Sequence, residues 1–556
     1  MHRSSLLTIS AISCALFGLA TVKLNSHFFA AEAAAQPQAA QTAPVTVSGA
    51  KALQIKPVSE TITTTTTAKT GDIPQPTNAP GTAVYVAKRG DTLPSVAHAQ
   101  LKNTAYLTSS ELGDAIRAAN NLGPSNFLKP GQEITIPGVL AAPVVEHSIS
   151  VPKDFEVRAI YLTGIMAASD HGIRIIKHWR EVGGNAVVFD IKDSDGSVNI
   201  PFEHPLLGNH HVYIHDLPKF VHFLHSENMH AIARVAIFRD ERLVTEHTEL
   251  AVQSRKNHGP WRENGKLVWT DSSNPKVQDY NIALAKFVAQ SGADEIQFDY
   301  VRFPAEGDQK DASFVFQNDR GATDASSAPA TTSKADNDCG GSASLRSGGT
   351  GEAPVSTRSV CKDLHAHIMQ RSDVITAFLK KAYAELHPTG ALLSLDVFGV
   401  MAWQRPVDLS HTGQDIVGMA KYCDVLSPMI YPSHFFGMDN IEHPGDAPEH
   451  FIGESMERFE LITKGSGVTI RPWLQAFHWR TKTYSPEYIK VQVATAREKG
   501  GIGFLFWNAA NDYSKPYEAM PEMKAADMKA GANPKYFRGD ELPGVTVRAA
   551  LTSPAN

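Results

Sequence analysis

Residues 292–304 read GADEIQFDYVRFP, and the apolar run in this stretch predicts a buried strand that ends at an aspartate, Asp299. Seven further apolar segments lie on both sides of it, and helical patterns separate most of them. Because strands and helices alternate, the sequence predicts an α/β fold with a parallel sheet covered on both faces. In chain order the predicted strands are Val157–Thr163, Asn185–Asp190, His230–Ile237, Asp294–Tyr300, Leu392–Val397, Tyr422–Met429, Thr469–Gln475 and Gly501–Trp507.

The number of predicted strands favours a closed barrel. Eight strands over residues 155–530 match the complement of a (β/α)8 TIM barrel. An open, doubly wound sheet is the competing fold, but no glycine-rich phosphate loop follows the first strand to support it. We therefore expect a TIM barrel whose catalytic groups lie at the carboxyl ends of its strands.

Acidic side chains end several of these strands. Asp299 ends the fourth predicted strand and Asp396 lies at the end of the fifth, so the two carboxylates are expected to face each other across the barrel mouth. Glycoside hydrolysis needs such a pair, one carboxylate as nucleophile or base and the other as acid. Carboxyl groups about 5–5.5 Å apart would favour retention of configuration, and about 6.5–9.5 Å would favour inversion. Asp299 and Asp396 are therefore the predicted catalytic residues.

The other strand ends carry groups that suit a polysaccharide. Aromatic rings offer faces on which sugars stack, and polar side chains can hydrogen-bond hydroxyls or hold a carboxylate ionised. A strand-end aspartate can instead cap the next helix or pair with an arginine, and a tryptophan can belong to the core. The predicted substrate-binding residues are Asp190, Lys192, Asp193, Arg234, Arg302, Tyr431, His434, Trp473, Gln475, Trp507 and Asn508.

Several of these strands also resemble a bacterial family of TIM-barrel proteins that is named for glycoside hydrolases and whose function is largely unassigned. The stretches that carry the resemblance include VRAIYLTG, NAVVFDIKDSDG, EIQFDYVRFP, LSLDVFG, SPMIYPSHF and FLFWNA, within residues 157–515. The resemblance implies a barrel distantly similar to the α-amylase and α-galactosidase groups, with Asp299 as nucleophile. The family often has an acidic residue after the glutamine of its WLQ motif, where this chain has Ala476. A third carboxylate, if needed, would come from Asp190 or Asp193.

A separate module precedes the predicted barrel. Residues 84–138 show a short strand, a Gly-Asp turn, a helix start at Thr92, a second helix through Ile116 and a closing strand, Glu133–Ile136. The motifs YV, GDTL, NNL and LKPGQ resemble a LysM domain, a small α+β fold that we place at residues 81–139. The resemblance implies binding of N-acetylglucosamine-containing glycans such as peptidoglycan or chitin; a module used only for folding or partner docking is the alternative. Its predicted glycan-binding residues are Gly90, Asp91, Thr92, Leu93, Asn121 and Leu122.

Low-complexity segments flank and interrupt the two predicted domains. Residues 1–35 have a basic start, an apolar run and then small residues, an order that predicts a secretory signal peptide, with an uncleaved membrane anchor as the alternative. Residues 36–80 predict a disordered linker and residues 531–556 a weakly patterned tail. Residues 307–357 predict a surface insertion in the barrel. We therefore expect an extracytoplasmic protein, whether periplasmic, envelope-associated or secreted.

Composition and residue spacing exclude several classes of partner. The chain has 556 residues, 42% of them hydrophobic, and a net charge of -6, so it is globular and lacks the positive field of a nucleic-acid-binding protein. The pair His222 and His225 has neither the HExxH arrangement nor an evident third ligand, so we expect no metal and no cofactor. Cys339 and Cys361 are placed to form a disulfide in an oxidising compartment, whereas Cys423 is predicted to be a buried thiol.

These features together predict an exported glycoside hydrolase that acts on a cell-envelope or extracellular polysaccharide, with the LysM module directing it to peptidoglycan-type glycan. Two alternatives remain open, a polysaccharide-binding protein with a barrel groove but no turnover and a scaffold for envelope partners. The variant Asp299→Asn separates the three: it should abolish turnover in an enzyme, alter only affinity in a binding protein and leave a scaffold unaffected.

Overall fold

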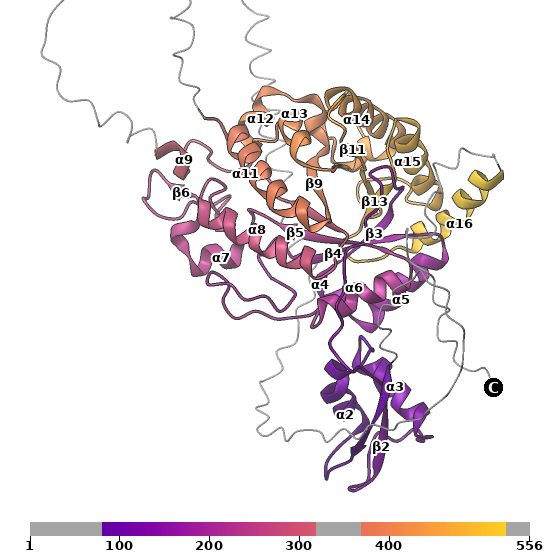
Figure 1. Ribbon diagram of the computed structural model, residues 1–556. Helices are drawn as coiled ribbons and strands as arrows, with labels where there is room; N and C mark the ends of the chain where they lie inside the picture. The colour runs from indigo at the N-terminus through magenta and orange to yellow at the C-terminus, as the bar shows by residue number, and fades with distance from the viewer. Residues whose placement is uncertain (1–79, 319–368, 530–556) are drawn as a thin grey trace, which may run out of the picture.

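The computed structural model describes residues 80–318 and 369–529, which form a large α/β barrel with a small module beside it (Figure 1). Neighbouring barrel strands pair in parallel, and the last strand pairs with the first, so the sheet closes and the predicted (β/α)8 TIM barrel is confirmed. The strands are β3 (Arg158–Leu162), β4 (Ala186–Lys192), β5 (His230–Ala236), β7 (Glu295–Asp299), β9 (Leu392–Phe398), β10 (Val425–Ile430), β11 (Thr469–Ile470) with β12 (Trp473–Gln475), and β13 (Phe504–Trp507).

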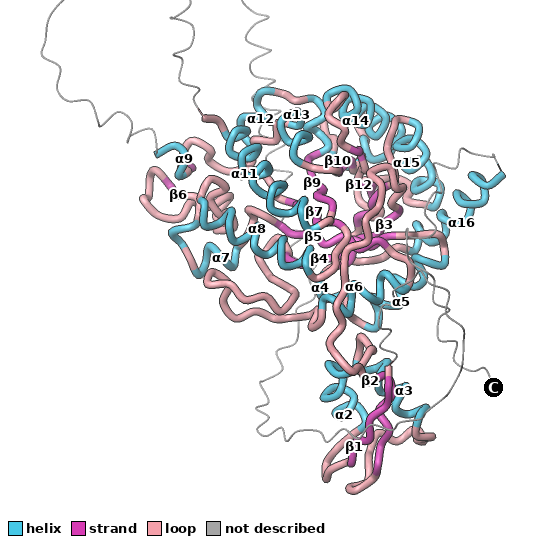
Figure 2. The backbone as a smooth tube through the Cα atoms, viewed as in Figure 1, coloured by secondary structure: helices cyan, strands magenta, loops and turns pink. Residues whose placement is uncertain are grey.

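Helices surround the strands as an outer layer (Figure 2). They start where the sequence supplies caps: the side chains of Ser169, Asp216, Asn274 and Ser485 each accept a hydrogen bond from a backbone N–H in the first turn. Because helices cover the outer face of the sheet, β3, β4, β5 and β7 are buried along their whole length. The helices are α5 (Asp170–Glu181), α6 (Leu217–Ser226), α8 (Pro275–Gln290), α11 (Arg371–Leu386), α12 (Pro406–Thr412), α13 (Ile416–Met419), α14 (Pro448–Ile462), α15 (Pro486–Glu498) and α16 (Ser514–Lys529).

The seventh barrel strand is divided in two. The sequence predicts one strand, Thr469–Gln475, but the structure has β11 and β12 separated by Arg471 and Pro472. Proline has no N–H to donate to the ladder, so regular pairing stops there. The Pro472 carbonyl still accepts a hydrogen bond from Leu505 N, 3.0 Å away, which keeps the two pieces in line with β13.

The first residues of the predicted insertion, 307–318, form ordered elements in the structure. Strand β8 (Ala312–Ser313) pairs antiparallel with β6 (Gln253–Ser254), and helix α9 (Val315–Asn318) follows. The buried Asp311 carboxylate accepts a hydrogen bond from Ser254 Oγ, 2.8 Å away, so this part of the segment belongs to the fold. The rest of the predicted insertion, residues 319–357, lies outside the described residues, as do Cys339 and Cys361.

Other sequence predictions have mixed outcomes. Cys423 is a buried thiol as predicted, and burial raises its pKa. No helix in the described ranges, residues 80–318 and 369–529, has both the length and the apolar character needed to cross a membrane. The predictions for residues 1–35, for the linker up to residue 79 and for residues 531–556 lie outside the described part of the chain.

The small module follows the predicted order of elements. Strands β1 (Gly81–Val86) and β2 (Glu133–Val139) pair antiparallel, and helices α2 (Leu93–Gln100) and α3 (Ser109–Ala119) pack on them. Thr92 caps α2 through a reciprocal pair of hydrogen bonds with Ser95. Pro94 falls in the first turn of α2, where the missing N–H has no helical partner to lose.

The segment between the module and the barrel is held at the end of α6. Glu146 contacts His222 Nδ1 at 2.6 Å and His225 Nδ1 at 3.3 Å, and His225 Nε2 lies 3.0 Å from Asp294. Asp294 also accepts a hydrogen bond from the backbone N of Ile149, 2.6 Å away. Burial disfavours the charge on His225, but its hydrogen bonds to Asp294 and Glu146 outweigh burial and raise its pKa to about 9.

This ion-pair cluster predicts an alkaline loss of stability. His225 binds its proton more tightly in the folded chain than in the unfolded one, so its contribution is complete below pH 6.5 and is lost as the pH rises through about 9. We expect the free energy of unfolding to fall by on the order of 2 kcal/mol between these limits. Urea unfolding at pH 6 and pH 9.5 measures it. The variant His225→Gln should lack this component, and an equal pH dependence in that variant would contradict the assignment.

Candidate active site

Arg234 lies at the centre of the predicted site. This buried residue of β5 donates from Nη1 to Asp190 Oδ1 at 2.6 Å, and from Nη2 and Nε to Asp299 Oδ2 at 2.6 and 3.1 Å. Its guanidinium lies over the rings of Tyr161 and Trp507, at 5.6 and 5.2 Å from their centroids. One arginine therefore links carboxylates from two strands and faces two aromatic rings.

Asp299 is held by hydrogen bonds to both of its oxygens. Oδ2 accepts from Arg234, and Oδ1 accepts from the backbone N of Tyr300, 2.6 Å away. Tyr300 has a φ of +51°, a left-handed conformation that bulky residues rarely adopt. Strained backbone of this kind persists where the surrounding structure holds it, and here it directly follows the predicted nucleophile. These contacts fix the orientation of the Asp299 carboxylate at the end of β7.

Asp396, on the adjacent strand β9, lies in a contrasting environment. Its Oδ1 accepts from Trp473 Nε1 at 2.6 Å and from Gln297 Nε2 at 2.8 Å. Burial and the nearby Asp299 charge raise the pKa of Asp396 well above its usual value. Arg234 Nε lies 3.1 Å from Asp299 Oδ2 and 4.0 Å from Asp396 Oδ2, so these two oxygens are at most about 7 Å apart. This limit is compatible with the separations that glycoside hydrolysis requires.

Two residues of this group were not predicted from the sequence. The Tyr161 hydroxyl, from β3, donates to Asp190 Oδ2. Burial, with a smaller contribution from Asp193, raises the pKa of Asp190 to about 7 in spite of Arg234. Gln297 donates to Asp396 and sits two residues before Asp299 on the same strand. The period-two alternation of a strand could have identified Gln297, whereas no local pattern marks Tyr161.

An aromatic wall adjoins the carboxylates. The rings of Tyr161 and Trp507 stack with centroids 4.1 Å apart, and Trp473 meets Trp507 edge to face at 5.6 Å. Trp507 is half-buried, whereas Trp473 is fully buried. The predicted residues that the structure brings together are therefore Asp190, Arg234, Asp299, Asp396, Trp473 and Trp507.

Lys192 lies apart from this group. Its ammonium group is fully buried and contacts Asp240 Oδ2 at 2.7 Å, Asn281 Oδ1 at 2.9 Å and the Ile237 carbonyl at 3.3 Å. The pairing of β4 with β5 shifts register between Asp190 and Lys192, so Lys192 does not continue the face on which Asp190 lies. The prediction that Lys192 binds substrate is corrected: its ammonium is used within the fold.

Gln475 and Asn508 have their polar groups directed to backbone. Gln475 Nε2 donates to the carbonyl of Phe477 at 3.1 Å, and its Oε1 accepts from Ser433 N at 3.2 Å. Asn508 Nδ2 donates to the Ala476 carbonyl at 2.6 Å. Both residues are buried. Their contacts fix the loops after β10, β12 and β13, so they support the mouth through backbone rather than through the predicted sugar contacts.

The remaining predicted side chains lie around the mouth. Tyr431 and His434 form an aromatic group, 5.4 Å between centroids, and burial together with Arg480 lowers the pKa of His434 to about 3, so its ring is neutral. Asp193 is half-buried and accepts a hydrogen bond from Ser194 N at 2.5 Å. Arg302 is buried with its guanidinium 4.4 Å from the Phe398 ring centroid. Of these four, Tyr431 packs in the same hydrophobic cluster as Tyr161, Trp473 and Trp507.

The carboxylates of Glu263 and Glu306, on the loops that follow β5 and β7, were also not predicted as site residues. Glu263 Oε1 accepts from the backbone N of Glu306 at 3.2 Å, and Glu306 Oε2 accepts from Asn264 Nδ2 at 2.9 Å. Burial and the Glu263 charge raise the pKa of Glu306 to about 7. Glu306 comes seven residues after Asp299, the last residue of β7. A prediction based on strand ends does not include residues so far into the following loop.

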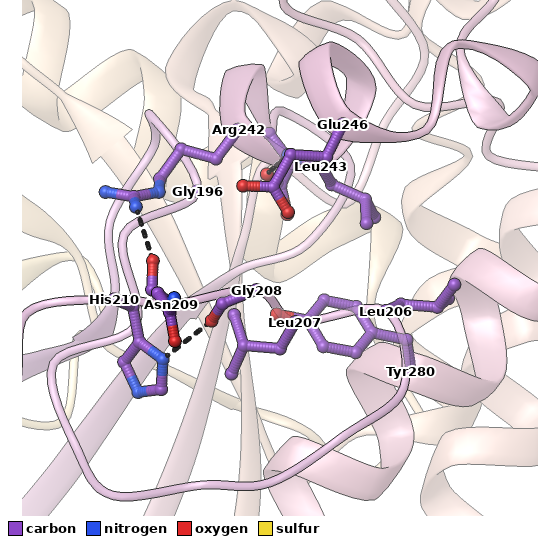
Figure 3. A pocket seen from close by; sticks show the side chains of 11 residues that line it. Gly196, Leu206, Leu207, Gly208, Asn209, His210, Arg242, Leu243, Glu246 and Tyr280 are labelled. Atoms are coloured by element: carbon purple, nitrogen blue, oxygen red, sulfur yellow. Dashed lines mark hydrogen bonds between the residues drawn. The ribbon is translucent and has the colours of Figure 1, made fainter.

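A separate hollow lies between the loop after β4 and helix α7 (Glu241–Glu246), as Figure 3 shows. Arg242 Nη2 donates to the Asn209 carbonyl at 3.2 Å, and His210 Nδ1 lies 3.2 Å from the Gly208 carbonyl, so side chains from this hollow hold the loop in place. None of its lining residues is a predicted site residue. The hollow is therefore distinct from the cluster formed by Arg234, Asp190, Asp299 and Asp396.

The closed barrel, with paired carboxylates and aromatic rings at the strand ends, defines the class of a glycosyl hydrolase barrel. Residues 159–513 match the family described as "Putative glycosyl hydrolase domain", and the chain belongs to this family. Residues 85–137 match the LysM domain. Both resemblances inferred from the sequence are confirmed, and the chain is classed as a glycosyl hydrolase.

Solved structures also resemble the chain. A hypothetical protein from Ruminiclostridium thermocellum is 28% identical over 43% of this chain and 97% of its own, with a TM-score of 0.31. The glycoside hydrolase domain of PgaB (BpsB) from Bordetella bronchiseptica is 12% identical over 66% and 98%, with a TM-score of 0.45. The spore cortex-lytic enzyme SleL from Bacillus megaterium is 12% identical over 79% and 85%, with a TM-score of 0.35. No curated protein matches the chain. Likenesses at these TM-scores carry no inference about its substrate.

Proposed function

We propose that the protein is an extracytoplasmic glycoside hydrolase that cleaves a cell-envelope or extracellular polysaccharide by a retaining mechanism. The observation that carries the proposal is the contrast between two neighbouring carboxylates. Asp299 is oriented by Arg234 and by a backbone N–H, whereas the buried Asp396 has a pKa raised well above its usual value. A carboxyl group that holds its proton more tightly suits the role of acid, and a carboxylate held in a fixed orientation suits the role of nucleophile.

The chemistry then follows in two steps. Asp299 attacks the anomeric carbon while the glycosidic bond breaks, and Asp396 gives its proton to the departing oxygen. In the second step Asp396 takes a proton from water, the water oxygen bonds to the anomeric carbon, and the bond to Asp299 breaks. Arg234 keeps the Asp299 carboxylate in place throughout, and the half-buried Trp507 supplies an aromatic ring against which a sugar can pack.

The LysM module supports targeting to peptidoglycan-type glycan. Its predicted loops, Gly90–Leu93 and Asn121–Leu122, lie at one end of the module, next to an exposed Phe127. We propose that these loops hold the glycan chain and bring the barrel to its substrate. Extracytoplasmic location is part of the same proposal, because peptidoglycan lies outside the cytoplasm.

Reducing-end release tests the proposed activity. The purified protein is incubated with peptidoglycan, chitin and a panel of α- and β-linked glucans, and new reducing ends are measured. Release from at least one polymer is the expected result, and the polymer that is cut identifies the substrate class. Pull-down on peptidoglycan without release from any polymer would overturn the proposal and favour a polysaccharide-binding protein.

Asp396 gives a prediction about the pH profile. Since its pKa is raised, activity should fall on the alkaline side as Asp396 loses its proton. The variant Asp396→Asn should lower the rate on a natural polysaccharide about 10²–10⁴-fold and remove this alkaline limb. It should lose much less on an aryl glycoside whose leaving group departs without a proton. Equal losses on both substrates would show that Asp396 is not the acid.

A further inference from the structure

The LysM module contacts the barrel through the end that carries residues 101–109. The segment from η1 (Leu101–Asn103) to the start of α3 lies against α5 and α6 (Figure 1). Lys219 of α6 is 5% exposed, and its Nζ donates to the carbonyls of Leu101 at 3.0 Å and Thr104 at 2.8 Å. A buried ammonium group is costly unless it is hydrogen-bonded, and the module supplies both of the acceptors described for it.

Two further contacts fix the same end of the module. Thr108 Oγ1 donates to Asp170 Oδ1 of α5 at 2.5 Å and also caps α3 by accepting from Glu111 N at 3.2 Å. Leu107 packs against the hydrophobic core of the barrel. The connecting segment is pinned as well, since Glu146 pairs with the histidines of α6. Contacts at several points on two helices are expected to hold the module in one orientation.

The predicted glycan loops lie at the opposite end. Helix α3 starts at the barrel and runs for 11 residues, so Asn121 and Leu122 lie about 16 Å farther out. The β1–β2 ladder runs the same way: Gly81 and Val139 are near the barrel end, whereas Val86 and Glu133 pair at the far end, just before the turn that contains Gly90. Figure 1 shows this end of the module pointing away from the barrel.

We infer that the LysM module is a fixed part of the barrel, docked on the flank made by α5 and α6, and not a freely tethered domain. Lys219 is the main polar anchor of this docking surface. A glycan held by the far loops is thereby kept at a set distance from the flank of the barrel. This consequence for the glycan rests on the proposed function, whereas the docking itself does not.

Nuclear spin relaxation of the full chain tests the docking. In the wild-type protein, methyl groups of the module and of the barrel should report the same rotational correlation time. In Lys219→Ala the correlation time of the module should fall about threefold, because a free module of this size tumbles much faster than the whole. The control is Lys177→Ala. Lys177 lines the same hollow between the module and the barrel, and its ammonium group lies over the ring of Phe223, which belongs to the barrel. This variant should leave the module docked.

A module that tumbles independently in the wild-type protein would overturn the inference. A Lys219→Ala module that still tumbles with the barrel would overturn the role of Lys219. If Lys219→Ala does not fold, Asp170→Ala removes the second hydrogen bond and should shorten the correlation time of the module to a smaller extent. None of these readouts depends on glycan binding or hydrolysis, so failure of the proposed function would be recognised separately.

Discussion

The variant Asp299→Asn is expected to lose at least about 10³-fold in the rate of polysaccharide hydrolysis, because the amide cannot act as the nucleophile. The amide oxygen can still accept from Arg234, and only the hydrogen bond from the backbone N of Tyr300 is lost, because an amide has one acceptor oxygen where a carboxylate has two. The variant should therefore fold and keep its affinity for glycan. Reducing-end release and a binding isotherm on the same polymer measure the two effects separately.

The matched control for this prediction is Asp279→Asn. Asp279 lies on α8 in an exposed ion pair with Lys381. Its replacement should leave the rate within about twofold of the wild type, since exposed ion pairs contribute little. Undiminished hydrolysis by Asp299→Asn would show that another group performs the first step, and Asp190 would then be the first residue to examine.

The variant Arg234→Met is expected to destabilise the protein by about 3–5 kcal/mol, because it leaves two buried carboxylates without their shared cation. Arg234 is 1% exposed and bonds Asp190 and Asp299 at 2.6 Å each. Adding Asp190→Asn to Arg234→Met removes one of the uncompensated charges and should recover part of the loss. Denaturant unfolding of the two variants and the wild type measures both effects.

An exposed arginine is the control for this effect. Arg405 pairs with Asp408 at 2.5 Å, but half of its side chain is exposed, so Arg405→Met should cost no more than about 1 kcal/mol. An equal decrease in the free energy of unfolding for Arg234→Met and Arg405→Met would mean that the buried ion pairs of Arg234 stabilise the fold no more than an exposed ion pair does.

Much of the fold could be predicted because parallel strands buried on both faces appear as short apolar runs between helices. All eight barrel strands were identified in this way. The division of the seventh strand at Pro472 was not predicted, although a proline inside a strand is a recognisable signal. The order of residues 307–318 was not predicted, because strand Ala312–Ser313 depends on pairing with Gln253–Ser254, which is distant in sequence.

The site was predicted in part, because the end of a barrel strand places a side chain at the mouth but does not say what that side chain contacts. Asp299, Asp396 and Arg234 meet because their strands are neighbours. Lys192 was assigned to the same group because the register shift after Asp190 leaves no mark in the sequence. Tyr161 was missed because its contact with Asp190 depends on how two strands lie side by side.

Trapping the reaction intermediate is the most direct test of the central claim, that Asp299 bonds covalently to the sugar. The variant Asp396→Ala lacks the base that activates water in the second step, so the intermediate should accumulate when an aryl glycoside supplies a good leaving group. After an acid quench, mass spectrometry of the peptide that contains Asp299 should show the added mass of one glycosyl unit. An unmodified Asp299 during continuing turnover, or a glycosyl unit on another residue, would contradict the account.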